Sequence, residues 1–341
     1  LGLIPDTVYK FVLKNRPIPP FVCSNVTLTE GAPEPEGYII LLPYSAGQLI
    51  EQQKLMLPRI KQAMKLAASK GAEIMGLGAF TSTITNGGRL LENNSHINIT
   101  NGNAFTALIT GKKVAQLINR LPCRKPVVAI VGATGSVGSL VSKLLAKNNP
   151  NAEYLLIARN SRKLQNVAHE MKTLNHYIQT TISENLEDII NADIVVLLTS
   201  ASDCLLQSHH LKPGAIVLDD TQPRNTNPEL LNERNDVTII DGGLVSVPHL
   251  QFQRSLGLPK GISFACLAET MLLALADYKG DFSIGNPTLE QAELIGNIAR
   301  QYSHLGFDTA PDHSFGKPLS KVIPIGHNYE FKLSPTLNFK S

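Results

Sequence analysis

Apolar and polar positions change their pattern near residue 126 of this 341-residue chain. Beyond that point, short apolar runs rich in β-branched residues alternate with helix-like segments that begin near Ser136 and Ser161. The runs occupy residues 127–131, 154–158, 193–199, 215–220 and 237–243. Continuous apolar strands that alternate with helices are typical of a parallel sheet covered on both faces. The pattern therefore predicts a doubly wound, Rossmann-type α/β fold in this part of the chain.

The preceding part of the chain has a less regular pattern. Its expected elements are a buried strand at 38–43, a helix from Gly47 to Lys70 that kinks or breaks at Pro58, a strand-like run at 74–80, and a long helix with Asn101 or Asn103 as N-cap. The proline-punctuated stretch "NRLPCRKP" then indicates a domain boundary. We expect an N-terminal α/β substrate-binding domain over residues 1–122, a Rossmann domain over 123–250, and a C-terminal helical segment over 251–341 that completes the cleft.

The composition of the chain excludes several classes of function. Apolar residues make up 43% and charged residues 17% of the chain, the balance of a globular enzyme. The net charge of +3 is too small to indicate a nucleic-acid partner. Four scattered cysteines fit neither a metal site nor a dense disulfide framework, which favours a reducing, cytoplasmic location and no metal. No apolar run reaches the roughly 20 residues of a transmembrane helix, so no transmembrane segment is expected.

A glycine-rich turn follows the first strand of the predicted Rossmann domain. In "VVAIVGATGSVGSLV", glycines with GxxGxxG spacing stand between a strand and a helix, as a dinucleotide-binding turn requires. The first glycine permits the tight turn, the next lets backbone N–H groups approach a pyrophosphate, and the third allows close helix–strand packing. The alternative is a strand-to-helix turn without a ligand. The expected cofactor-binding residues here are Gly132, Ala133, Thr134, Gly135, Ser136, Val137 and Gly138.

The end of the second strand indicates which nicotinamide cofactor is bound. An NAD site usually has an acidic residue there, whereas this strand ends in "IARNSRK", which contains no acid. Arg159 and Arg162, with Lys163 beside them, suit a 2′-phosphate through charge-assisted hydrogen bonds. Cations that only solvated this helix start would oppose the helix dipole, so the sequence predicts NADPH. The other expected cofactor contacts are Asn160, Thr199 and Ser200.

"ISFACLAET" sets one cysteine near the start of an apolar helix-like segment. Core packing is one interpretation of Cys266, because buried cysteines usually behave as small hydrophobic residues. A helix N-terminus would, however, lower the pKa of a thiol, and Glu269 and Thr270 lie close to the same helical face. Beside bound NADPH, a Cys266 thiolate would attack an acyl group and form a thioester that hydride reduces to an aldehyde.

Two N-terminal stretches, "GAFTST" and "NGNAFT", have the small and hydroxyl residues of active-site loops. A thioester carbonyl or the nicotinamide is the expected ligand of their polar side chains, although helix capping alone would explain Asn103. The expected substrate-binding residues are Phe80, Thr81, Ser82 and Asn103, together with Gly242 and Gly243 of "DGGLV".

These stretches together resemble the long-chain acyl-acyl-carrier-protein reductases of the cyanobacterial type. The similar segments, in the family's order, are "GLGAFTSTI", "TNGNAFTA", "VAIVGATGSVGS", "LLIARNSRKL", "DGGLV" and "FACLAETMLL". The resemblance implies NADPH-dependent reduction of a fatty acyl thioester to a fatty aldehyde, within lipid metabolism and alkane biosynthesis. It places the acylated cysteine at Cys266, the phosphate loop at Gly132, Thr134, Gly135 and Gly138, and the basic cofactor residue at Arg159. The chain departs from the family at "LDDTQPRN" and "SVPHLQF".

The resemblance also implies partners. An acidic acyl carrier protein would be the acyl donor, with coenzyme A thioesters as the other source, and an aldehyde-consuming enzyme would take the product. Lys54, Lys61 and Lys65 share one face of the predicted N-terminal helix, with Arg59 nearby. Such a face would steer an acidic carrier, although most basic faces are only solvated.

Two other functions fit the same pattern. A small α/β domain before a Rossmann domain also suits shikimate-dehydrogenase-like oxidoreductases that act on polar small molecules. Those enzymes would need a Lys–Asp pair in the cleft, and the N-terminal loops do not show one. The third hypothesis is a nucleotide-binding homologue that keeps the fold and performs no turnover.

Overall fold

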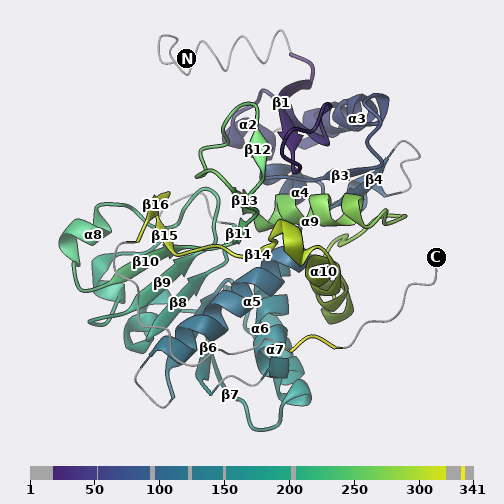
Figure 1. Cartoon of the computed structure of the whole chain (residues 1–341). Coiled ribbons are helices and arrows are strands. Elements are labelled where there is room, and N and C mark those ends of the chain that lie inside the picture. The colour runs from purple at the N-terminus through teal and green to yellow at the C-terminus, as the bar shows by residue number, and fades with distance from the viewer. Residues whose placement is uncertain are drawn as a thin grey trace.

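The computed structural model describes residues 18–51, 53–92, 97–121, 125–148, 151–200, 205–319 and 332–334. Its largest sheet is parallel and six-stranded, and the N-terminal elements lie above it in the view of Figure 1. The strands are β5 (Val127–Val131), β6 (Glu153–Ile157), β7 (Gln179–Ser183), β8 (Ile194–Leu197), β9 (Ile216–Asp219) and β10 (Thr238–Asp241). They lie in the order β7-β6-β5-β8-β9-β10. Successive strands are added on one side of β5 as far as β7 and then, from β8, on its other side, as in Rossmann folds. The predicted fold class is confirmed.

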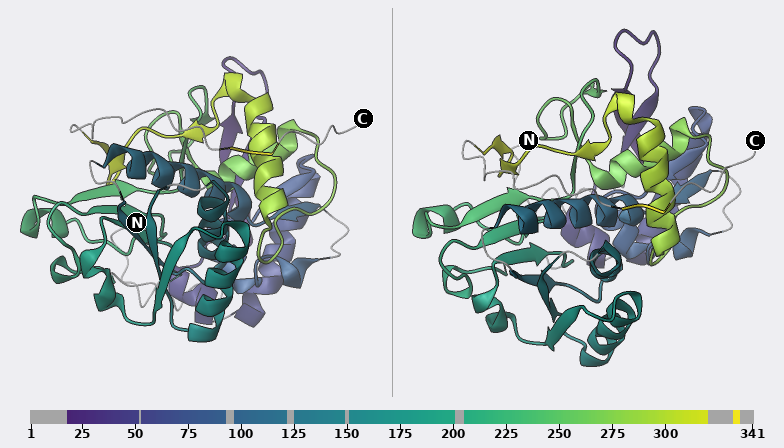
Figure 2. Two further views of the ribbon diagram at one scale, coloured as in Figure 1. Left: turned by 90° about the horizontal axis from the view of Figure 1, so that it is seen from below. Right: turned by 60° about the horizontal axis from the view of Figure 1, so that its bottom comes forward.

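Helices cover both faces of this sheet because its strands are apolar on both sides. Val128 and Ile130 of β5 belong to a buried cluster with α5 (Asn103–Arg120), α6 (Ser136–Asn148) and α7 (Ser161–Leu174). Ala129 and Val131 point to the other face, which is covered by η2 (Leu186–Asn191), α8 (Leu230–Glu233) and the apolar residues that flank η3 (Ser208–His210). Figure 2 shows α5 lying along the sheet beside α6.

The N-terminal elements form two small sheets and their covering helices. One sheet is antiparallel, in the order β12-β1-β2, and the other pairs β3 with β4 in parallel. The elements are β1 (Phe21–Thr27), β2 (Gly37–Leu41), α2 (Ala46–Glu51), α3 (Gln53–Ser69), β3 (Ile74–Gly76), α4 (Phe80–Ile84), η1 (Arg89–Leu91) and β4 (Asn98–Thr100). Since β12 (Gln251–Phe252) follows β1 by more than 200 residues in the chain, this sheet is completed by a distant segment.

The C-terminal segment packs between these two regions. Its elements are β11 (Leu244–Ser246), β13 (Ile262–Phe264), α9 (Ala265–Leu275), α10 (Leu289–Gln301), η4 (Ser303–Leu305), β14 (Asp308–Thr309), β15 (His313–Ser314) and β16 (Lys317–Pro318). One buried cluster joins Val26 of β1, Leu108 of α5, Leu272 of α9 and Ile295 of α10. The helices predicted here are present, and the domain boundaries at residues 122 and 250 stay predictions.

Three local predictions were wrong, the first of them in part. Of the kink or break predicted at Pro58, the break is absent, because α3 continues through this residue while Met56, Ile60 and Met64 bury one helical face, and the kink stays a prediction. The run predicted as a strand at 74–80 ends at Gly76, and Phe80 begins the short helix α4. Neither asparagine caps α5, because Gly102 occupies the N-cap position in a left-handed conformation.

Among the described residues, the helices are all too short or too polar to cross a bilayer.

Candidate active site

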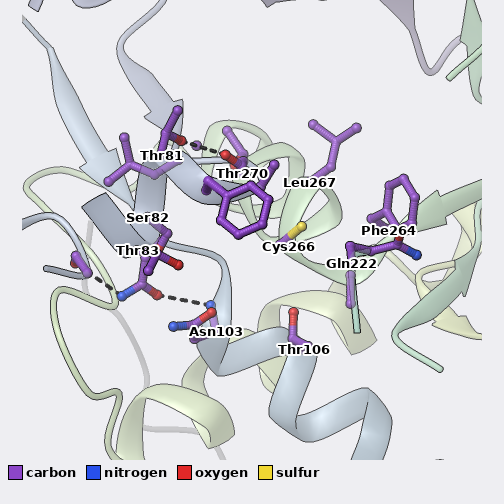
Figure 3. Close-up of a pocket in the computed structure, with 18 of the residues that line it drawn as sticks. Thr81, Ser82, Thr83, Asn103, Thr106, Gln222, Phe264, Cys266, Leu267 and Thr270 are labelled. Carbon is purple, nitrogen blue, oxygen red and sulfur yellow. Dashed lines mark hydrogen bonds between the residues drawn. The ribbon is translucent and has the colours of Figure 1, made fainter. Parts of the chain in front are cut away.

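A cavity of about 2010 Å³ opens at the carboxyl ends of β5, β6, β8 and β9 and continues toward β2 and α3. Its wall includes both the glycine turn that follows β5 and the cysteine of "FACLAE". Figure 3 shows the part of the cavity where α4, α5 and α9 meet, with Thr81, Asn103, Thr106 and Cys266 drawn from these three helices. The fold therefore brings the predicted cofactor residues and the predicted nucleophile to one space.

Most predicted site residues line this cavity. Those that do are Phe80, Thr81, Ser82, Asn103, Gly132, Thr134, Gly135, Ser136, Val137, Arg159, Asn160, Thr199, Ser200, Gly243 and Cys266. Those absent from its wall are Ala133, Gly138, Arg162 and Gly242. Ala133 and Gly138 are buried, so their place is in the packing of the turn.

The glycine turn has the geometry that a close backbone approach requires. Gly132 has φ +90°, and a Cβ there would lie 2.6 Å from the carbonyl oxygen of Leu198. A Cβ at Gly138 would lie 2.2 Å from the carbonyl oxygen of Gly132, which explains the tight contact of α6 with the turn. Residues with this arrangement at a helix N-terminus fit the pyrophosphate of a dinucleotide.

The loop after β6 presents cations to the cavity. Arg159 and Lys163 line it and are exposed, whereas Arg162 does not line it. Asn160 caps α7, since its Oδ1 accepts the backbone N–H of Lys163 at 2.9 Å. No acidic residue stands at the end of β6, where an acid would bind a ribose 2′-hydroxyl.

Polar side chains connect the glycine turn to its surroundings. The side-chain amide of Asn103 donates to the Ser136 hydroxyl at 2.9 Å, and that hydroxyl donates to the carbonyl of Gly285 at 3.1 Å. After β8, the Thr199 hydroxyl donates to Oδ1 of Asn225 at 2.5 Å. Asn103 and Thr199 therefore hold the wall of the cavity in place as well as lining it.

Cys266 is the second residue of α9 and packs against the start of α5. A Cβ at Gly102 would lie 2.3 Å from Cβ of Cys266, and Gly102 has φ +79°. The N–H of Ala265 donates to the carbonyl of Gly243 at 2.7 Å, which fixes the start of α9. Burial, followed by the nearby carboxylates of Asp220 and Glu269, raises the pKa of the Cys266 thiol to about 11. The prediction that the helix N-terminus lowers this pKa is wrong, because desolvation outweighs it.

Glu269 lies one turn after Cys266 on the same helix and is fully buried. Its Oε2 accepts the N–H of Phe105 at 2.7 Å, and its Oε1 accepts the hydroxyl of Thr100. Since the N-cap residue of α5 is glycine, this carboxylate satisfies first-turn donors of α5 from another helix. Burial raises the pKa of Glu269 to about 7, although its hydrogen-bond donors act in the opposite direction.

Sequence reasoning missed several residues of the cavity wall, and one of them, Asp220, carries a carboxyl group. Thr106, Gln222 and Phe264 line the wall near Cys266 as well (Figure 3). Asp220 directly follows β9, and residues after parallel strands face the ligand crevice of such sheets. That rule would have found Asp220 in "AIVLDD".

A cluster formed by η2 and η3 has the residue types of a metal site. Glu187, His209 and His210 hold their side-chain ligand atoms within 4.8 Å of one another. Nδ1 of His210, however, accepts the N–H of Gln207 at 3.1 Å. A neutral imidazole then carries its proton on Nε2, which lies 3.2 Å from Glu187 and is not free to bind a metal ion. The cluster is better explained as hydrogen-bonded pairs.

Comparisons with known proteins agree with the fold and the glycine turn. Residues 127–247, about a third of the chain, match the family model of the semialdehyde dehydrogenase NAD binding domain. The aminotransferase PigE of Serratia sp. is 28% identical over 294 residues, which cover 84% of this chain and 34% of PigE. The chain thus spans about a third of the length of that relative. A long-chain acyl-[acyl-carrier-protein] reductase of Synechococcus elongatus is 27% identical over 261 residues, covering 71% of this chain and 73% of the reductase.

Solved structures are similar over part of the chain. The iminosuccinate reductase of Paracoccus denitrificans in complex with NAD⁺ is 24% identical, with 36% of this chain and 38% of that chain covered at a TM-score of 0.29. The nucleotide-binding domain of glutamyl-tRNA reductase from Thermoplasma volcanium is 15% identical, with 40% and 84% covered at a TM-score of 0.29. The matched family domain, the strand order and the glycine turn show that residues 127–247 form a Rossmann-type domain of the kind that binds a nicotinamide dinucleotide.

Proposed function

We propose that this protein reduces a fatty acyl thioester to a fatty aldehyde with NADPH, through a thioester on Cys266. The observation that carries the proposal is that Cys266 and the dinucleotide-binding turn line one cavity. The 27% identity to an acyl-[acyl-carrier-protein] reductase over most of both chains supports the same reaction. Acyl carrier protein is the proposed donor, and an aldehyde-consuming enzyme is the proposed recipient of the product.

Part of the cavity wall is rich in apolar residues that suit an acyl chain. These residues, many of them from β2, β3 and α9, include Leu28, Ile39, Ile40, Leu42, Met75, Leu77, Phe80, Met271, Leu275 and Tyr278. Burial of a methylene group in such surroundings stabilises a complex by about 0.8 kcal/mol. These apolar residues therefore favour a long acyl group over a short polar one.

The proposed reaction divides into acyl transfer and reduction. The sulfur of Cys266 forms a bond to the acyl carbon, the bond from that carbon to the carrier sulfur breaks, and the carrier leaves as a thiol. Bound NADPH supplies the hydride that reduces the acyl group to the aldehyde. The bond between the acyl carbon and Cys266 then breaks, and the cysteine regains a proton from solvent.

Intact-protein mass spectrometry tests this proposal directly. The native protein is incubated with palmitoyl-acyl-carrier-protein or palmitoyl coenzyme A in the absence of NADPH. An adduct of one palmitoyl group on the Cys266 peptide is expected, and later addition of NADPH should remove it with release of an equal amount of hexadecanal. A protein that takes up no acyl group from either donor would contradict the proposal.

Replacement of Arg159 by alanine should weaken NADPH binding selectively. Loss of a charge-assisted hydrogen bond costs about 1.5–3 kcal/mol, so the KM for NADPH should rise by about 10-fold to 100-fold while that for NADH changes little. Arg162→Ala is the matched control, because Arg162 does not line the cavity. Steady-state kinetics with both cofactors measures the effect, and a native preference for NADH would contradict the assignment.

Charge reversal on α3 tests the proposed docking of acyl carrier protein. Lys61 and Lys65 are exposed on this helix, and the structure describes no ion pair for either. The Lys61→Glu/Lys65→Glu variant should show a KM for acyl carrier protein raised about 10-fold at low salt, with kcat and the KM for acyl coenzyme A unchanged. Lys172→Glu is the control, because Lys172 is exposed on a different helix, α7. An unchanged KM would remove this docking site.

A further inference from the structure

Asp220 places a carboxyl group in the wall of the cavity that holds Cys266. It directly follows β9, and its backbone N–H donates to the carbonyl of Leu197 on β8 at 3.1 Å. The Thr110 hydroxyl, from α5, donates to Oδ2 of the carboxyl group. The sheet and α5 therefore fix the position of this side chain.

Gly243 connects Asp220 to the helix that carries Cys266. A Cβ at this glycine would lie 2.0 Å from Oδ1 of Asp220, so the carboxyl group packs directly over the glycine backbone. The carbonyl of the same glycine accepts the N–H of Ala265, the residue before Cys266, at 2.7 Å. One backbone residue thus contacts both the carboxyl group and the start of α9.

Glu269 is the other carboxyl group near Cys266, and it is unsuited to proton exchange with a bound substrate. Its Oε2 accepts the N–H of Phe105 in the first turn of α5, its Oε1 accepts the hydroxyl of Thr100 at the end of β4, and the side chain has no exposed surface. Unlike Asp220, it does not line the cavity. Asp220 is therefore the carboxyl group that a substrate and the thiol can share.

We propose that Asp220 accepts the proton of the Cys266 thiol during acyl transfer and then donates it to the departing carrier thiolate. This inference rests on the proposed function. The S–H bond of Cys266 breaks as its sulfur bonds to the acyl carbon, and the proton moves to the carboxylate. When the bond from the acyl carbon to the carrier sulfur breaks, that sulfur takes the proton, so that Asp220 is a carboxylate again and no redox change occurs.

The charges around these groups give the step a pH dependence. Burial raises the pKa of Asp220 to about 7; the Thr110 hydroxyl opposes this shift and the neighbouring Asp219 adds to it. Cys266 and Glu269 are the titratable groups of α9, the helix that begins beside this carboxyl group. Because only the carboxylate accepts a proton, the rate of acylation should rise as the pH rises through about 7.

The test measures acylation of Cys266 by palmitoyl coenzyme A without NADPH, by rapid quench and intact mass, from pH 5.5 to 9. In Asp220→Asn the rate at pH 7.5 should fall by about 100-fold or more, the usual contribution of a general base. Alkylation of the same thiol by iodoacetamide at pH 9 should stay equal or become faster, since the variant removes a negative charge that raises the thiol pKa.

Thr110→Val provides a second measurement, the pH midpoint of acylation. A purely structural role of Asp220 would leave this midpoint unchanged. Loss of its hydroxyl removes the hydrogen bond that lowers the pKa of Asp220, so the midpoint of the acylation profile should move to higher pH. An unmoved midpoint would contradict the role of Asp220 as proton acceptor. This variant also tests that role if Asp220→Asn does not fold.

The other possible outcomes distinguish failure of the inference on Asp220 from failure of the proposed function. Acylation by Asp220→Asn at the native rate or faster would overturn the inference, because a nearby charge alone predicts that result. A fall in both acylation and alkylation would also overturn it, since Asp220 would then position Cys266 without taking its proton. Native protein that reacts with iodoacetamide and is never acylated would refute the proposed function itself.

Discussion

Cys266→Ser should abolish aldehyde formation, with kcat lowered on the order of 10⁴-fold or more, as loss of a nucleophile commonly does. A serine hydroxyl ionises far less readily than a thiol, and its acyl ester is a poorer acceptor of hydride than a thioester. The variant should also lose the palmitoyl adduct seen by intact mass. Gas chromatography of hexadecanal and mass spectrometry of the protein measure the two effects.

Cys23→Ser is the matched control for this variant. Cys23 is the other described free cysteine, it lies on β1, and it does not line the cavity. Its replacement should leave both the adduct and the turnover unchanged. Full aldehyde production by Cys266→Ser would refute the role of the cysteine and, with it, the thioester route.

Gly102→Ala should lower both stability and activity. A left-handed backbone costs an L-residue about 1–2 kcal/mol, and the added methyl group would overlap Cβ of Cys266 at 2.3 Å. Overpacking of this kind costs a further 1–3 kcal/mol or so, so the free energy of unfolding should fall by about 3 kcal/mol. Because relief of the overlap moves Cys266, turnover should fall by about 100-fold.

Gly71→Ala separates backbone strain from displacement of the cysteine. Gly71 has φ +81°, close to that of Gly102, and no atom lies within 4 Å of the Cβ position. Its replacement should cost only the strain, about 1–2 kcal/mol, with native turnover. Urea unfolding and steady-state kinetics of both variants give the comparison. Equal effects of the two substitutions on turnover would show that the contact with Cys266 is unimportant.

The parts of the fold that were predicted correctly are those encoded within short segments. The apolar run at 127–131, the glycine turn and the helix from Ser136 are contiguous, so their order alone identifies a dinucleotide-binding turn. The strand β7 was missed because it is an edge strand, whose mostly polar residues show no apolar run. The helix does not break at Pro58, because tertiary burial of one face of α3 outweighs the missing N–H.

The site depended on contacts that no local pattern encodes. Asp220 packs against Gly243 and accepts a hydrogen bond from Thr110, two residues that are far apart in the chain. Glu269 accepts a backbone N–H in the first turn of a helix that begins more than 160 residues earlier. The predicted direction of the Cys266 pKa shift was wrong for the same reason. Position at a helix N-terminus is visible in sequence, whereas the burial and the two carboxylates that raise the pKa exist only after the chain has folded.

The sequence by itself determined a Rossmann domain, a cofactor turn without an acidic partner after the second strand, and one cysteine at the start of an apolar helix. Each of these follows from residues close together in the chain, where spacing fixes geometry. The tertiary structure decided that this cysteine shares a cavity with the turn and with the carboxyl group of Asp220, and that burial raises the pKa of its thiol. These properties depend on desolvation and on charges from distant segments, which only the folded chain brings together.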